Sequence, residues 1–149
     1  MSKSNTWESD LLKLVFNNTT ASLIGDATGI VGSGSAGVLY VSLHTADPTE
    51  GGDQTSSETG YTGYARISVA RTTGGWTISG NTPTQAANAA TVTFGQCTAG
   101  SSTITYVGVG TSISGTGKLL YSGILGSSLA VSNNITPSFA AGALVITED

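Results

Sequence analysis

The chain has 149 residues, which is enough to bury a single core of ordinary size. Only 9% of its residues are charged, 21 are glycine, and serine and threonine are abundant, a composition that excludes a mostly helical protein and favours a mostly β one. The formal net charge is −4, and three lysines with two arginines cannot assemble a basic patch, so no nucleic-acid partner is expected.

Residues 5–17 are predicted to form the one good helix. Asn5 suits the N-cap position, and Glu8 follows three residues later, as in a capping box. The pair Asn17-Asn18 is expected to end the helix.

An apolar stripe runs along this helix at the spacing i, i+4, i+7, i+8. Its members are Trp7, Leu11, Leu14 and Val15, and Leu12 with Phe16 widen it. A stripe this apolar must be buried, and two alternatives remain open. The helix packs on its own domain, or residues 1–20 form an arm that docks on a neighbouring subunit. The four members of the stripe are therefore candidate interface residues.

Alternation of apolar and polar residues predicts about eight strands, separated by glycine- and asparagine-rich turns. Seven of them have clear bounds and cover residues 38–45, 64–70, 89–94, 104–109, 119–125, 129–131 and 143–147. This number and spacing favour a single antiparallel β-sandwich, of jelly-roll or immunoglobulin-like type, over residues 21–149.

Residues 46–62 form a long polar connection, and connections of this length are usually functional or mobile. The loop carries acidic side chains, namely Asp47, Glu50, Asp53 and Glu58. The main expectation is a solvated acidic loop, with a calcium site as the alternative, because calcium prefers oxygen ligands. Tyr61 and Tyr64 lie beside the loop and are candidates for a recognition surface.

Motifs that could carry chemistry lack their required context. Gly32, Gly34 and Gly37 match G-x-G-x-x-G, but a strand rather than a helix follows them. His44 is the only histidine, no G-x-S-x-G elbow exists, and a hydrogen-bonded structural histidine at a strand end is expected. Cys97 cannot form an internal disulfide and is expected to be a small buried residue. No catalytic residue, metal or other cofactor is predicted.

Membrane insertion and secretion are not expected either. No apolar run approaches the ~20 residues that cross a bilayer. Residues 1–10 are polar and contain two acidic residues, unlike a secretory signal.

The sequence resembles a family of small tailed-bacteriophage virion proteins, labelled tail fibre or head decoration proteins. The segments that carry the resemblance lie in order along nearly the whole chain: LLKLVFNN at 11–18, LYVSLHTADP at 39–48, GYARISV at 63–69, KLLYSGIL at 118–125 and SFAAGALVIT at 138–147, with AATVTF at 89–94 and YVG at 106–108 between them.

The resemblance implies a structural protein at the particle surface, made in the host cytoplasm, and supplies no catalytic residues. The leading expectation is a capsid decoration (cement) protein that binds the major capsid protein as a homo-oligomer, trimer or dimer. The alternative is a tail-associated structural or receptor-binding module. The absence of repetitive shaft segments favours decoration.

Overall fold

The computed structural model describes residues 3–80 and 83–148, and the chain divides into two compact units. Unit 1 combines residues 1–38, 69–91 and 139–149, and unit 2 combines residues 39–68 and 92–138. The predicted division into an arm over 1–20 and a domain over 21–149 stays a prediction.

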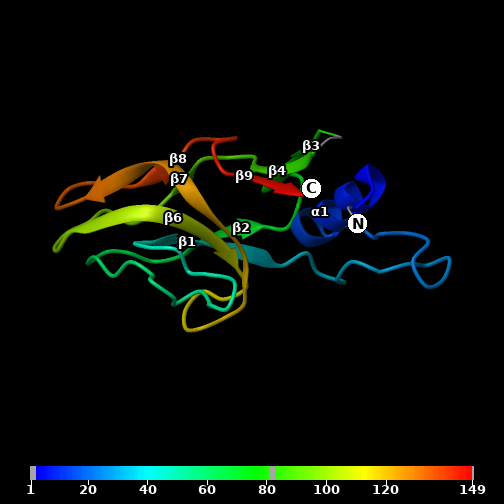
Figure 1. The fold of residues 1–149 in the computed structure, drawn as a ribbon, viewed down its shortest axis with the longest axis horizontal. Coiled ribbons are helices and arrows are strands. Elements are labelled where there is room, and N and C mark those ends of the chain that lie inside the picture. The colour runs from blue at the N-terminus through cyan, green and yellow to red at the C-terminus, as the bar shows by residue number, and fades with distance from the viewer. Residues whose placement is uncertain (1–2, 81–82, 149) are drawn as a thin grey trace. The chain divides into compact units, whose positions relative to one another are not determined.

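The described residues contain one α-helix and nine strands (Figure 1). The elements are α1 (Asn5–Asn17), β1 (Val38–His44), β2 (Ile67–Ala70), β3 (Trp76–Ser79), β4 (Thr84–Asn88), β5 (Val92–Thr93), β6 (Ser102–Gly110), β7 (Leu119–Val131), β8 (Ser138–Phe139) and β9 (Val145–Glu148). They form sheets with the strand orders β2-β1-β6-β7, β3-β4-β9 and β5-β8. The pairs β1–β6, β6–β7, β3–β4 and β4–β9 are antiparallel. The predicted class, mostly β and antiparallel with one N-terminal helix, is confirmed.

Helix α1 has the predicted bounds, but its N-cap is Ser4 rather than Asn5. The Ser4 hydroxyl oxygen accepts a hydrogen bond from the Trp7 backbone N–H at 3.4 Å. Trp7 therefore occupies the position that a capping box reserves for Glu8, and that prediction is wrong by one residue. The helix ends as expected, with Asn18 in the left-handed conformation at φ 55°.

In unit 1, α1 packs against the sheet β3-β4-β9, as the first alternative for the helix expects (Figure 1). Its buried face consists of Glu8, Leu12 and Phe16, and the Phe16 ring meets Trp76 edge-to-face, with centroids 4.8 Å apart. The predicted stripe lies beside this face and is only half-buried; it comprises Trp7, Leu11, Leu14 and Val15.

Arg71 fixes the C-terminal end of α1. Its guanidinium donates to the carbonyl oxygens of Leu14 and Val15, both at 2.7 Å, and to that of Ala36 at 3.2 Å. The last carbonyls of a helix lack intrahelical hydrogen-bond partners. A cation near them also interacts favourably with the negative end of the helix dipole. Arg71 therefore joins the helix end to the glycine-rich connection that precedes β1.

The strand predictions failed where neighbouring strands, rather than local preference, determine the structure. Strand β4 has the sequence TQAAN, which has low β propensity, yet it pairs with β3 on one side and β9 on the other. Strand β7 is one strand, not the two predicted. Its register on β6 jumps from Ile104↔Leu129 to Tyr106↔Ile124, so residues 125–128 bulge where a break was expected.

In unit 2, strand β1 is buried on both faces. Leu39, Val41 and Leu43 occupy one face and belong to the apolar core. The other face carries Ser42 and His44, which are also fully buried. A polar layer therefore lies between this face and the segment that covers it, residues 46–62. This covering segment positions the candidate site.

Candidate functional site

The connection 46–62 folds back onto strand β1. The Thr45 backbone N–H donates to the Ser57 carbonyl at 2.8 Å, and the Thr59 N–H donates to the Leu43 carbonyl at 2.9 Å. The connection is therefore an ordered loop that begins and ends on the same strand.

His44 anchors the underside of this loop. Its Nδ1 donates to the Ser56 carbonyl at 2.8 Å, so in the neutral ring Nε2 accepts from the Ser42 hydroxyl, also at 2.8 Å. Burial lowers the pKa of His44. The predicted hydrogen bond from the strand end to the following loop is confirmed. Ser42 and His44 have the spacing of a nucleophile and its base, but both are 0% exposed, so no substrate reaches them in this conformation.

Glycines on strand β6 make room for the polar layer. Gly108 lies opposite Ser42, and a Cβ there would meet His44 Nε2 at 2.6 Å and Ser42 Oγ at 2.7 Å. Gly110 lies opposite Tyr40, and a Cβ there would clash with the Gln54 side chain. Larger residues at either position would displace the loop.

Gln54 attaches the loop to the turn between β6 and β7. The side chain is fully buried, and its Oε1 accepts from the backbone N–H groups of Thr111 at 2.9 Å and Ser112 at 2.8 Å. The Gln54 backbone N–H donates to the Thr116 carbonyl at 2.9 Å. Composition alone classed this residue as part of a solvated loop, and no sequence signal marks it as buried.

Arg66 and Glu58 form the second link between the loop and the turn. The Arg66 Nε lies 2.6 Å from Glu58 Oε1, and Nη2 lies 2.7 Å from Oε2, which is the bidentate arrangement. The guanidinium also donates to the carbonyl oxygens of Ser112 at 3.0 Å and Gly115 at 2.8 Å. The hydrogen bond to Glu58 raises the pKa of Arg66. Sequence reasoning missed this pair, although an arginine inside an apolar strand pattern signals a buried partner.

The predicted interface tyrosines lie inside unit 2. Tyr61 is 5% exposed and donates its hydroxyl to the Gly95 carbonyl at 3.0 Å. Its ring contacts that of Tyr64 edge-to-face at 5.5 Å, and Tyr64 stacks on Phe94 at 6.1 Å. The Tyr64 hydroxyl donates to Glu58 Oε1 at 2.8 Å, and burial raises the pKa of Tyr64. An interface role for these tyrosines and for the α1 stripe stays a prediction.

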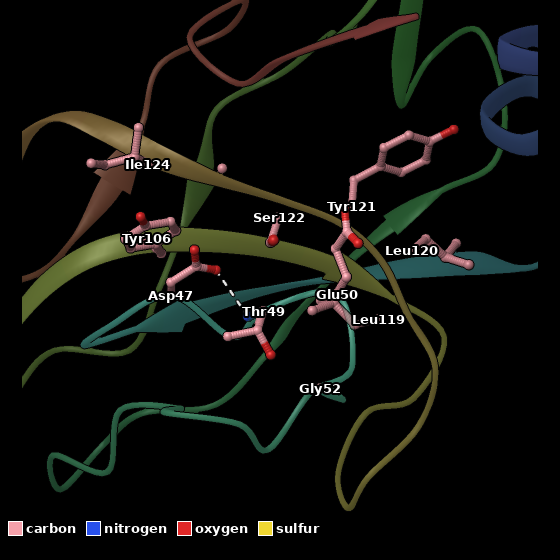
Figure 2. A pocket seen from close by; sticks show the side chains of 11 residues that line it. Asp47, Thr49, Glu50, Gly52, Tyr106, Leu119, Leu120, Tyr121, Ser122 and Ile124 are labelled. Atoms are coloured by element: carbon pink, nitrogen blue, oxygen red, sulfur yellow. Dashed lines mark hydrogen bonds between the residues drawn. The ribbon is translucent and has the colours of Figure 1, made fainter.

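A hollow of about 580 Å³ lies between the start of the loop and strand β7. It is lined by Asp47, Thr49, Glu50, Gly52, Tyr106, Leu119, Leu120, Tyr121, Ser122, Gly123 and Ile124. Asp47 Oδ1 accepts from the Thr49 N–H at 2.9 Å, which fixes that carboxylate, and the Tyr121 ring points away from the hollow (Figure 2). The hollow therefore offers carboxylates, hydroxyls and one tyrosine ring, and no lining residue is basic.

The remaining loop acid, Asp53, has a local role. Asp53 Oδ1 accepts from the Thr55 hydroxyl at 2.6 Å and from the Thr55 backbone N–H at 2.7 Å, and these hydrogen bonds lower the pKa of Asp53.

Among residues 3–80 and 83–148, no group of three His, Cys, Asp or Glu side chains is arranged to hold a metal ion. Cys97 is buried and unpaired with any other cysteine, as predicted. No helix within the described part of the chain is long and apolar enough to cross a membrane.

The comparison with protein families identifies the chain as a structural protein of a tailed-bacteriophage virion, which confirms the resemblance in its sequence. In particular, it belongs to the Gp80 family, described as podophage GP4 fiber I protein gp80, whose model matches residues 2–147. No match to the chain was found among curated proteins.

Proposed function

We propose that the chain is a structural subunit of a phage tail fibre, and that it works as a homo-oligomer. The observation that carries the proposal is the match of a fibre-protein family to nearly the whole chain, residues 2–147. Capsid decoration, the leading expectation from the sequence, depended on the absence of shaft repeats. A family description that names a fibre outweighs that indirect argument.

Features of unit 2 support a role in making contacts at a rigid surface. The loop 46–62 and the turn 111–118 are joined through Gln54 and through the Glu58–Arg66 pair. Binding residues are often placed on loops that a rigid scaffold holds in position.

In unit 1, half-buried apolar residues on α1, among them Leu11 and Leu14, support contacts with a second subunit.

The test is to locate and count the protein in purified particles. Antibodies against the recombinant protein, coupled to gold, are applied to intact virions and to separated heads and tails, with an antibody against the major capsid protein as the control. Quantitative mass spectrometry gives the copy number relative to that capsid protein. We expect label on tails and a copy number far below that of the capsid protein. Label over the head in hundreds of copies would instead identify a decoration protein.

A further inference from the structure

Strand β7 presents an open edge to its surroundings. It is the last strand in the order β2-β1-β6-β7, and within the described residues no strand pairs with its outer side. None of its 13 residues is charged or proline. Natural sheet edges are usually protected by charges, proline, bulges or a covering segment, because their free N–H and C=O groups accept a further strand. The bulge at residues 125–128 interrupts this edge, and so does a register shift at Leu120, which has no partner between Gly110↔Leu119 and Val109↔Tyr121. Residues 121–124 are therefore the regularly paired, unprotected stretch.

The hollow extends along this stretch. Its lining includes Leu119 and Leu120 and all four residues of the regularly paired part, 121–124. Side chains of a strand alternate between the two faces of a sheet, so a hollow on one face alone would be lined by every second residue. The hollow therefore reaches the main chain of β7 as well as the side chains of one face. Ile124 is 73% exposed at this place.

The wall opposite the strand is acidic. Asp47 and Glu50 supply two carboxylates, and no Lys or Arg lies among the lining residues. The ring of Tyr106 contributes to the same hollow (Figure 2). Asp47 lies beside Tyr106, whereas Glu50 lies toward Leu119 (Figure 2). Carboxylates and an aromatic ring attract a guanidinium or an ammonium group by charge and by cation–π interaction.

We propose that this edge binds an extended segment of a different protein, which adds a strand to β7 and places a Lys or Arg side chain in the hollow. Main-chain hydrogen bonds along the edge would provide affinity, and the hollow would select the basic side chain. The inference stands independently of the fibre assignment.

The composition of the chain's own strands argues against a second copy as the occupant. None of the nine strands that the structure describes contains a Lys or Arg. Arg66 and Arg71 are occupied by hydrogen bonds inside their units, and Lys3 pairs with Glu148 at 3.1 Å. Lys13 lies in α1, and Lys118 precedes β7 itself. Within its described strands the chain therefore has no basic residue to offer a second copy, and only Lys118 stands at the end of the edge strand itself.

The binding test uses synthetic peptides and the ¹⁵N-labelled full chain. One probe is a nine-residue peptide of alternating valine and threonine with a central arginine. A second probe has a central glutamate, and a third is the arginine peptide with alternate amides N-methylated on the pairing edge. We expect the arginine peptide to shift the amide resonances of residues 119–124 and 47–52. The glutamate peptide should bind more weakly, and the N-methylated peptide should produce no shifts.

Matched variants separate the edge from the acidic wall. Asp47→Asn with Glu50→Gln keeps the shape of the wall, and it should weaken binding of the arginine peptide about fivefold, as for two exposed ion pairs. Ser122→Lys should weaken it through repulsion, whereas Ser128→Lys in the bulge and Asp10→Asn in α1 are controls that should leave it unchanged.

Five results would overturn the proposal. Residues 119–124 do not respond at millimolar peptide; the N-methylated peptide binds as well as the parent; the neutralised wall binds the arginine peptide unchanged; or glucose shifts the hollow's resonances while the peptides do not. Concentration-dependent broadening of residues 119–124 without peptide would assign the edge to a second copy and also refute it.

Discussion

Replacement of Arg66 by methionine tests whether the buried ion pair holds unit 2 together. The substitution keeps most of the aliphatic stem but removes the bidentate contact to Glu58 and the hydrogen bonds to Ser112 and Gly115. Removing one member of a buried pair costs about 3–5 kcal/mol. The Arg66 side chain is 2% exposed and the Glu58 side chain is 16% exposed, so some water reaches Glu58. We therefore expect a loss of stability at the lower end of that range, about 3 kcal/mol.

The assay is urea unfolding followed by far-UV circular dichroism, because both tryptophans, Trp7 and Trp76, lie in unit 1 and do not report on unit 2. The matched control is Lys3→Met, which removes the more exposed Lys3–Glu148 pair and should cost less than about 1 kcal/mol. A loss below about 1 kcal/mol for Arg66→Met would show that the pair is screened like a surface pair, and would refute the reasoning.

Three further predictions concern other parts of the chain. Gly108→Ala should destabilise unit 2 by about 1–3 kcal/mol, since its Cβ would meet His44 Nε2, whereas Gly123→Ala, with no atom within 4 Å, is the neutral control in the same denaturation assay. Burial lowers the pKa of His44 in the folded state, so the unfolded chain binds more protons and stability should fall as pH drops below about 6.5; a His44→Gln variant should flatten this dependence between pH 7.5 and pH 5. Leu11→Asp with Leu14→Asp should dissociate the proposed homo-oligomer in light scattering without loss of helical circular dichroism, and an unchanged oligomeric mass would exclude this face of α1 as the contact.

The elements that the sequence predicted well are those whose own residues carry the pattern. Strand β1 alternates Leu39, Val41 and Leu43 with polar residues, and α1 has apolar spacing and a clear end at Asn18. Strand β4 could not be predicted, because its alanines and amides adopt the strand form only between β3 and β9. Local pattern predicts an element when propensity and tertiary pairing agree, and fails when pairing alone decides.

The candidate site was predicted only in part for a similar reason. The length and acidity of 46–62 indicated a functional loop, and Asp47 and Glu50 do line the hollow. The contribution of Tyr106 and of strand β7 arises from the register of β6 and β7, which is set across a bulge that no residue pattern reveals. Burial of Gln54 is likewise a product of long-range contact with the turn at Thr111.

The polar layer on β1 explains why the acidic wall of the hollow has a defined position. Gly108 and Gly110 remove side-chain volume from one face of β6, and this space accepts His44, Ser42 and Gln54 instead of a second apolar core. The His44 ring, the Ser42 hydroxyl and the Gln54 amide oxygen have directional partners, so the loop fits on the sheet in one register, whereas an apolar interface would tolerate sliding. A ligand that enters the hollow therefore meets a wall that is already ordered, and binding does not have to supply the conformational entropy of fixing the loop.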